Sequence, residues 1–411
     1  MDKGKIVAIL EKTIEWSLYL MIFCLPFSKT IIEITITVAL LAWIAKKVLL
    51  KDFRLKKTPL NISLFAFFIA CVISLVNADN KFFTFYALIT KCLKWIILYF
   101  IIIEEINSDV KIKNLLKITL LSGMVIAIDA FIQYYYTHVD LLRNYPSFKY
   151  RPELAPYRGF PTGSFPFPND LSAWILVILI PALILAIFGV ANIYARIGLG
   201  IFSSALLYLF YLANTRSAWL GFVISFGFIL ILKRIKLLLA IILLILAILP
   251  FLPQAKTRDI LATNSLADRF AMWKTGWKIF SEHPVIGNGL NTFFGKFKEF
   301  REDEARGKRG SYAHNGFLQI AADIGLVGLI AFLAILTQLF YRSLIFIKKC
   351  KNRFYQSLAI GLGGGLLAFL IHSFFDTNLH SLPLVALFWL NVGVLMSLPY
   401  ICPTDIKKFS L

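Results

Sequence analysis

Apolar runs of helix length recur along most of the chain and limit what it can fold into. A helix needs about 20 apolar residues to cross a bilayer. We predict spans at residues 12–27, 30–46, 59–77, 83–103, 114–134, 170–189, 194–213, 217–232, 236–252, 316–345, 355–374 and 383–401. The predicted fold is an all-α integral membrane protein with about 12 transmembrane helices, in a single polytopic membrane domain over residues 1–411.

The composition agrees with a chain that is nearly all membrane. Hydrophobic residues make up 59% of the sequence and charged residues 16%, whereas soluble domains carry about 45–50% and roughly 25%. The five cysteines are scattered, without a CxxC pair or a disulfide framework. In one run Gly361 and Gly365 stand four apart, a spacing that predicts close packing between helices.

The net charge of +20 is concentrated in short connections between the predicted spans. Lysine and arginine clusters lie at 46–57, 111–117, 233–236, 348–353 and 407–408. Cytoplasmic loops carry an excess of these residues, so the pattern predicts a multi-pass protein with both termini in the cytoplasm. It also argues against nucleic acid as a partner, because no basic domain stands apart from the spans.

Two long connections, 135–169 and 253–315, fall on the outer side in this topology. In the second, large apolar residues recur at spacings of four and three, which predicts an amphipathic helix near 265–281 at the membrane surface. These residues are Leu266, Phe270, Trp273, Trp277 and Phe280. We therefore expect a partly helical outer loop domain, with 135–169 as the first outer loop and 253–315 as the main one.

His314 and Asn315 stand where the main outer loop re-enters an apolar run. Histidine has an unperturbed pKa near neutral pH, so it can take or give a proton there. Asn315 could orient the ring or cap the following helix. From position alone, a loop histidine without chemistry is the commoner case.

Two arginines at the outer boundary are candidates for binding an anion. Arg216 joins two predicted spans with almost no loop, and Arg269 lies beside the apolar stripe near 265–281. The planar guanidinium suits phosphate recognition. The alternative is a charge that reaches lipid headgroups or water.

A last polar group flanks two further spans. His372 and Asp376 are four apart at the outer end of the span 355–374, so they could share a helix face and pair. Asn169 precedes the span 170–189, where helix capping is the simpler interpretation. The sequence has no phosphate-binding GxxxxGK[ST] loop and no Cys/His cluster with zinc spacing, so we predict neither a metal nor a cofactor.

Taken together, these segments resemble the O-antigen ligase/polymerase superfamily of bacterial membrane glycosyltransferases, over roughly residues 160–400. The segments are Pro168-Asn169, Thr215-Arg216-Ser217-Ala218-Trp219-Leu220-Gly221, Arg269 with Trp273, His283-Pro284-Val285-Ile286-Gly287-Asn288-Gly289, His314-Asn315 before Phe317-Leu318-Gln319, Gly325-Leu326-Val327-Gly328 and His372-Ser373-Phe374-Phe375-Asp376. The set is most like an O-antigen ligase.

The resemblance implies a metal-independent, inverting reaction on the periplasmic face of the inner membrane. A glycan carried on polyprenyl diphosphate would move to a sugar hydroxyl of lipid A-core and complete lipopolysaccharide. His314 would be the general base, and Arg216 with Arg269 would hold the diphosphate. Asn315, Asn169, Gly287, Gly289, His372 and Asp376 would support them.

Other functions stay open on the sequence alone. An O-antigen polymerase or a protein O-oligosaccharyltransferase of the same superfamily shares these motifs, although the latter tends to be longer. A lipid-glycan transporter or flippase is a different class, which typically has broken or charged helices near the middle of the membrane. The polar residues singled out above gather instead on the outer face, which favours a transferase.

Overall fold

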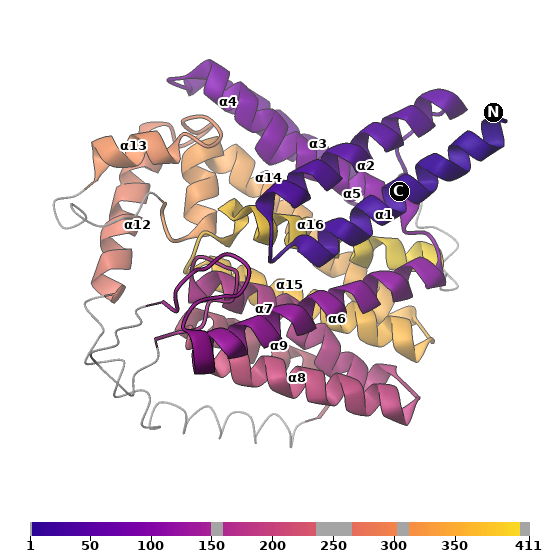
Figure 1. Ribbon diagram of the computed structural model, residues 1–411. Coiled ribbons are helices and arrows are strands. Elements are labelled where there is room, and N and C mark those ends of the chain that lie inside the picture. Colours follow the sequence, from indigo (N-terminus) through magenta and orange to yellow (C-terminus); the bar gives the residue numbers. More distant parts are fainter. Residues whose placement is uncertain (1, 149–158, 236–264, 302–311, 403–411) are drawn as a thin grey trace.

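The computed structural model describes residues 2–148, 159–235, 265–301 and 312–402. Within these residues the chain is helical, with two isolated β-bridges in the first outer loop (Figure 1). The helices are α1 Lys3–Cys24, α2 Lys29–Leu50, α3 Asn61–Ile73, η1 Ser74–Asn77, α4 Lys81–Ala87, η2 Leu88–Leu93, α5 Lys94–Glu105, α6 Asp109–Ile132, η3 Gln133–Thr137, α7 Pro168–Ile184, η5 Leu185–Gly189, α8 Ile193–Ala213, α9 Arg216–Leu232, α12 Ser265–Glu282, α13 Phe293–Phe300, α14 Gly316–Lys349, α15 Arg353–Ser373, η8 Asn378–His380 and α16 Leu382–Ile401.

Seven helices of the described chain are long and apolar enough to cross a membrane. They are Lys81–Glu105, Asp109–Thr137, Pro168–Gly189, Ile193–Ala213, Gly316–Lys349, Arg353–Ser373 and Leu382–Ile401. An all-α membrane protein is therefore confirmed, but the count of twelve spans is not.

The difference in the count has physical reasons. Charged residues interrupt α1 and α2, which were predicted as the spans 12–27 and 30–46. The runs at 59–77 and 217–232 form the shorter apolar helices Asn61–Asn77 and Arg216–Leu232. The predicted span 236–252 lies outside the described residues.

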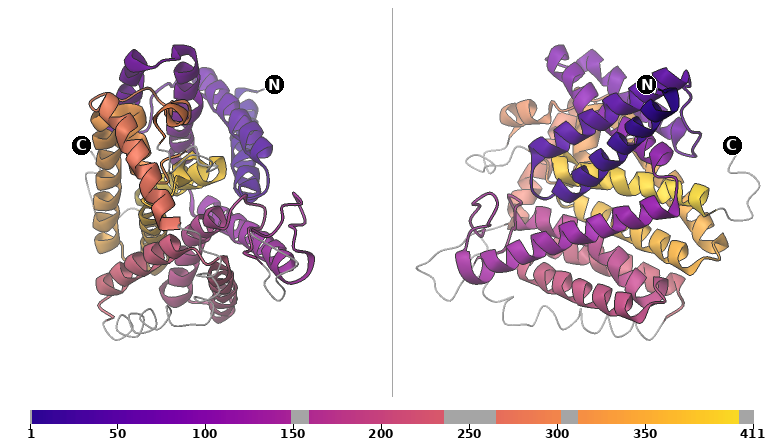
Figure 2. Two further views of the ribbon diagram at one scale, coloured as in Figure 1. Left: turned by 90° about the vertical axis from the view of Figure 1, so that its left-hand side faces the viewer. Right: turned by 45° about the vertical axis from the view of Figure 1, so that its right-hand side comes forward.

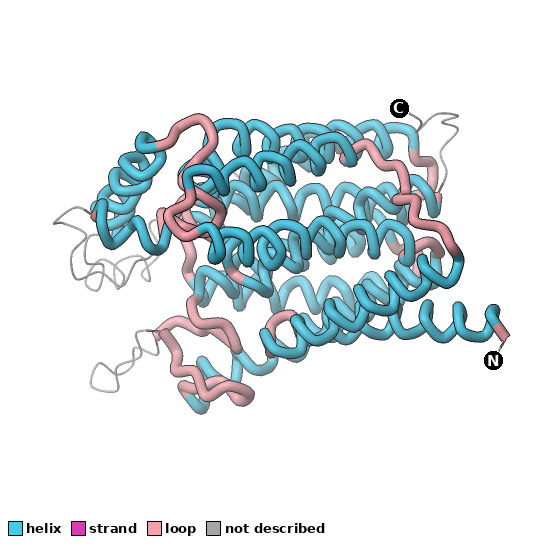
Figure 3. Tube along the Cα trace, turned by 90° about the horizontal axis from the view of Figure 1, so that it is seen from above, coloured by secondary structure: helices cyan, strands magenta, loops and turns pink. Residues whose placement is uncertain are grey.

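The helices run side by side between two distinct ends of the molecule (Figures 1 and 3). At one end, which we call the termini end, α1 begins and α16 finishes. Lys46 there binds Glu11 at 2.7 Å and Glu105 at 3.0 Å, which ties α1, α2 and α5 together. At the other end, the loop end, lie α12, α13 and the described part of the first outer loop (Figure 2).

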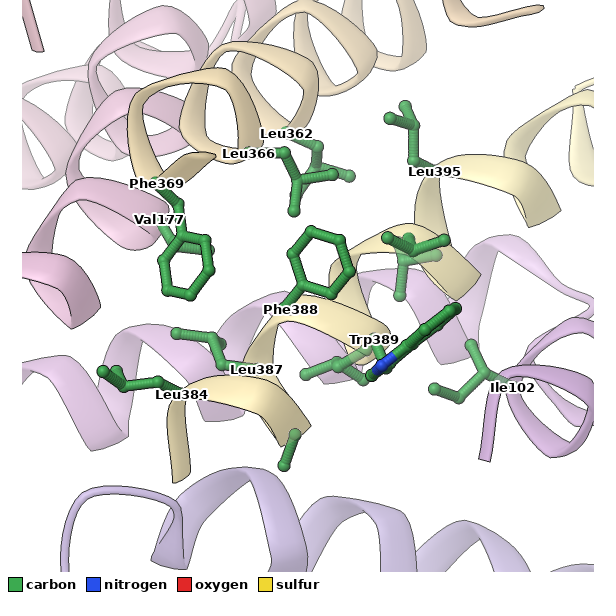
Figure 4. Close-up of a cluster of buried hydrophobic side chains, with 14 of the residues drawn as sticks. Ile102, Val177, Leu362, Leu366, Phe369, Leu384, Leu387, Phe388, Trp389 and Leu395 are labelled. Atoms are coloured by element: carbon green, nitrogen blue, oxygen red, sulfur yellow. The ribbon is translucent and has the colours of Figure 1, made fainter. Parts of the chain in front are cut away.

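The core of the bundle is formed by α7, α15 and α16, which bury most of their side chains. Phe369 of α15 stacks on Phe388 of α16 at 5.8 Å between ring centroids (Figure 4). Two glycines let α15 approach α7, because a Cβ on Gly361 would lie 2.5 Å from the Cα of Pro181 and one on Gly365 would lie 3.2 Å from that of Val177. The small-residue spacing therefore has a packing role.

One spanning helix, α14, is broken near the loop end. Gly325 has φ 68° and ψ −174°, a conformation open essentially to glycine alone. The turn Gly287–Gly289 fills the break: the N–H of Gly289 donates to the carbonyl of Asp323 at 2.9 Å, and the N–H of Leu326 donates to that of Pro284 at 2.9 Å. Backbone groups freed by the kink thus find partners within the protein, as a membrane interior requires.

This geometry predicts that Gly325→Ala destabilises the protein. A Cβ at Gly325 would lie 2.2 Å from the carbonyl oxygen of Val285, and the strained backbone alone costs about 1–3 kcal/mol. The matched control is Gly363→Ala on α15, where an added Cβ meets nothing within 4 Å. We expect a lower melting temperature in detergent for Gly325→Ala and an unchanged or higher one for Gly363→Ala. Equal melting temperatures for the two variants would contradict the need for glycine at position 325.

Candidate active site

His314 is held by its backbone at the start of α14. The side chain of Asn315 caps the helix by accepting from the N–H groups of Phe317 and Leu318, each at 3.0 Å. The indole N–H of Trp273 on α12 donates to the carbonyl of His314 at 3.2 Å. His314 itself has a positive φ of 46°, a left-handed conformation that is uncommon for residues other than glycine. The imidazole therefore has a defined position at the loop end.

The ring of His314 is paired with a carboxylate. Its Nδ1 lies 3.3 Å from Oδ1 of Asp376, and 34% of the histidine side chain is exposed. An ionised carboxylate can only accept a hydrogen bond, so Nδ1 carries the proton. The lone pair of Nε2 is then available to take a proton from a substrate.

Asp376 is fixed by two further donors. The backbone N–H of Thr377 donates to Oδ1 at 2.8 Å, and the side-chain amide of Asn169 donates to Oδ2 at 2.6 Å. Only 13% of the Asp376 side chain is exposed. Burial raises the pKa of the Asp376 carboxyl, but the hydrogen bond and positive charge of His314, with help from His372 and Thr377, lower that pKa below its usual range. The group is an anion at neutral pH.

A buried hydrogen-bond network extends from Asn169. Its side-chain oxygen accepts from the hydroxyl of Thr215 at 3.3 Å, which in turn accepts from Ser172 at 2.9 Å. The ring Nε2 of His372 lies 3.3 Å from the backbone carbonyl of Asn169. We call His314, Asp376, Asn169, Thr215, Ser172 and His372 the His314 cluster. It joins the starts of α7, α9 and α14 to the end of α15.

Two expectations about this cluster were wrong. His372 and Asp376 do not pair with each other, because α15 ends at Ser373 and the chain turns before it reaches Asp376. Asn169 does not cap α7: the residue at the cap is Phe167, and the Asn169 side chain serves Asp376 and Thr215 instead.

The two arginines approach the cluster from different helices. Arg216 is the first residue of α9, exposed and directly after the buried Thr215. Arg269 on α12 is partly exposed, and its charge is close enough to act on His372. Arg269 also lies one helical turn before Trp273, whose indole binds the backbone of His314. Both cations therefore border the region of His314.

Gly287 and Gly289 lie away from the His314 cluster. Their turn packs on the kink of α14, and the side-chain amide of Asn288 donates to the carbonyls of Ile279 at 2.7 Å and Ala322 at 3.1 Å. The two glycines contact α14 and the segment η1–α4 instead of the His314 cluster: the amide of Asn77 donates to the carbonyl of Gly287 at 3.0 Å, and Gly289 lies against Ala78 and Thr84.

Sequence reasoning missed Thr215 and Ser172 as members of the cluster. Thr215 directly precedes Arg216, which was a usable signal, but nothing in the spacing linked Ser172 to it. In the part of the chain that the structure describes, no group of three or more His, Cys, Asp or Glu side chains is placed to hold a metal ion.

Comparison with known families narrows the identity of this region. A family model described as O-antigen ligase matches residues 201–333, which include Arg216, Arg269 and His314. This segment belongs to the O-antigen ligase/polymerase superfamily. The family predicted from the motifs is thus confirmed, and its members are glycosyltransferase-like enzymes. A search of curated proteins gave no match. Asn169, His372 and Asp376 lie outside the matched segment of the O-antigen ligase family.

The lowered pKa of Asp376 predicts a contribution to stability that acid removes. A carboxyl whose folded pKa is depressed stabilises the protein above its unfolded pKa of about 3.9, and this is lost as pH falls through the folded pKa. When the pH falls from neutral to below about pH 4, the free energy of unfolding of the wild type should therefore decrease by about 1–3 kcal/mol more than that of Asp376→Asn.

The measurement is the melting temperature in detergent as a function of pH. Asp52→Asn is the control, because Asp52 is an exposed loop carboxylate paired with Arg54 at 3.5 Å. A wild type and an Asp376→Asn variant with parallel pH profiles would contradict the assignment.

Proposed function

We propose that the protein is an O-antigen ligase, which transfers a glycan from polyprenyl diphosphate to a sugar hydroxyl of lipid A-core. The observation that carries the proposal is the His314–Asp376 pair, 3.3 Å between Nδ1 and Oδ1, in a chain whose segment 201–333 matches the O-antigen ligase family. This pair prepares a base at the end of the bundle where the loops gather.

The proposed reaction is a single displacement at the anomeric carbon of the donor. Nε2 of His314 removes the proton of the acceptor hydroxyl while its oxygen attacks that carbon. The bond from the anomeric carbon to the diphosphate oxygen breaks, and the diphosphate leaves with the electron pair. Asp376 stabilises the imidazolium that forms, and the configuration at the anomeric carbon inverts.

In this proposal Arg216 and Arg269 bind the diphosphate and balance the charge that grows as it departs. Guanidinium–phosphate hydrogen bonds are among the strong, directional ones, and fixed cations aimed at developing charge accelerate such steps. Because the donor already carries a good leaving group, the proposed reaction needs neither metal nor nucleotide. Asn169 acts through Asp376, His372 supports the backbone of Asn169, and Asn315 holds the backbone at His314.

The proposed location is the bacterial inner membrane, with the active site on the periplasmic face and both termini in the cytoplasm. Two observations support it. The lysine cluster Lys46–Lys57 lies at the termini end, where Lys46 and Lys47 pair with Glu105 and Glu104. The His314 cluster lies at the opposite, loop end.

Transport is less well supported. A transporter would place its site at a helix break near the middle of the membrane. The break in α14 at Ile324 and Gly325 is filled by the protein's own Gly287–Gly289 turn. A polymerase or a protein O-oligosaccharyltransferase of the same family remains the nearest alternative.

The proposed base predicts a loss of turnover rather than of binding. With purified protein, polyprenyl-diphosphate glycan and core lipid, His314→Ala should lower kcat about 100-fold or more. Asp376→Asn should lower kcat by roughly 10- to 100-fold with little change in KM, because it removes the partner of the imidazolium. In the same assay, Arg216→Gln and Arg269→Gln should also raise KM for the donor.

Two control variants belong to this assay. His283→Ala removes a loop-end histidine outside the cluster, and Arg301→Gln removes an exposed loop-end arginine. Both should transfer glycan at the wild-type rate. Full activity of His314→Ala would contradict the assignment of His314 as the general base.

Cells that lack the gene separate ligase from polymerase. Loss of a ligase should leave core lipid bare and accumulate glycan on the polyprenyl carrier. Loss of a polymerase should instead leave core lipid with a single repeat. Gel analysis of lipopolysaccharide distinguishes the two patterns, and the single-repeat pattern would reject the ligase.

A further inference from the structure

Lysines stand inside one spanning helix near the loop end. The span Lys81–Glu105 contains a π-helical turn, η2 Leu88–Leu93, between α4 and α5. Lys91 lies in this turn and is exposed. Lys94 is the first residue of α5, directly after the turn. Charged side chains within a span are costly and rare, and they typically mark a binding site. π-helical turns likewise concentrate at functional sites.

One of these lysines already has a partner. The ammonium of Lys94 binds both carboxylate oxygens of Glu33 on α2, at 2.8 Å and 3.0 Å. Lys29, the exposed first residue of α2, lies one helical turn from Glu33. Lys91 is within electrostatic range of Lys94, Glu33 and Lys29.

The lysine group, Lys29, Lys91 and Lys94, therefore has an excess of positive charge. Glu33 is paired with Lys94 at 2.8 Å, and the carboxyl of Asp170 lies within electrostatic range of Lys29. Among the described residues no carboxylate lies within ion-pair distance of Lys91 or Lys29. Like charges held close together are unfavourable, and an anion bound between them would remove that cost.

The lysine group borders the His314 cluster, and its three residues lie outside the segment that matches the O-antigen ligase family. Lys29 is within electrostatic range of Asp170, the neighbour of Asn169. Lys91 acts on His380, whose ring packs on Tyr312 at 5.4 Å, two residues before His314. Burial, together with the charge of Lys91, lowers the pKa of His380 to about 3. His380 is therefore neutral at physiological pH.

We propose that Lys29, Lys91 and Lys94 form a second anion site, which binds the phosphate group of a membrane lipid beside the His314 cluster. A phosphate carried on a lipid fits better than free phosphate, because Lys91 is exposed on a spanning helix and not on a loop. Basic groups between spanning helices are known to bind lipid headgroups. The role of this site rests on the proposed function. In that role, the lysines would hold the phosphate-bearing acceptor lipid while the arginines hold the donor.

The test is lipid binding by the full chain in detergent, read by native mass spectrometry. The probes are dioleoyl phosphatidic acid, dioleoylglycerol with the same chains but no phosphate, and inorganic phosphate. The variant is Lys29→Gln with Lys91→Gln, leaving Lys94 in place so that Glu33 keeps its partner. Lys117→Gln is the control, because Lys117 is an exposed lysine on the spanning helix α6.

We expect the wild type to bind phosphatidic acid about tenfold more tightly than dioleoylglycerol, and the double variant to lose this preference. Lys117→Gln should keep it. Equal binding of the two lipids, or an equal loss in Lys117→Gln, would overturn the site. Competition by inorganic phosphate at the same concentration as the lipid would overturn its assignment to a lipid.

The transfer assay then tests the role separately. The double variant should raise KM for the acceptor lipid several-fold while kcat stays near that of the wild type. If the wild type transfers no glycan, the proposed function fails, yet the binding measurement still decides the lysine site. If transfer occurs and acceptor KM is unchanged, the acceptor role of the lysine group is wrong.

Discussion

The arrangement at the loop end depends on the buried carboxylate of Asp376. Its two oxygens accept from His314, Thr377 and Asn169, at 3.3, 2.8 and 2.6 Å. An unpaired carboxylate in such a place would cost several kcal/mol, so the three donors and the helices that carry them are held together. The same charge fixes which nitrogen of His314 bears a proton. The carboxylate of Asp376 thus both holds the helix ends together and determines which ring nitrogen of His314 carries a proton.

The site is assembled from parts that are far apart in the sequence but share one physical situation. α7, α9 and α14 all begin at this end of the bundle, and their first turns have N–H groups without partners inside the helix. The side chains of Asn169, Thr215 and Asn315 occupy these starts. Only Asn315 is used as a cap; Asn169 and Thr215 turn to each other. Polar residues at helix ends thereby become available for a shared network.

This explains what could be predicted from the sequence and what could not. Apolar runs predict the spanning helices because each run must form its own backbone hydrogen bonds within the membrane. Charged residues lower the number of helices that are apolar enough to span, as Glu11 and Lys12 do in α1. The motif around His314 predicts a site because the residues are local. The pairing of His314 with Asp376 was not predictable from spacing, since the helix expected to carry His372 and Asp376 on one face ends at Ser373. A partner 207 residues away, such as Asn169 for Asp376, leaves no periodic signal.

The helix starts that meet at the loop end also affect how this end of the bundle would bind an anionic substrate. The N-terminus of a helix carries a partial positive charge and binds phosphate readily. Three helices begin around the His314 cluster; Asn315 caps the start of α14, and Arg216 is the first residue of α9. Arg269 and the lysine group add full charges at the border. The carboxylate of Asp376 would repel a phosphate in this setting, but its oxygens point to His314, Thr377 and Asn169 and are largely covered. The cations therefore lie at the border of the cluster, while the carboxylate of Asp376 is turned inward toward His314, Thr377 and Asn169.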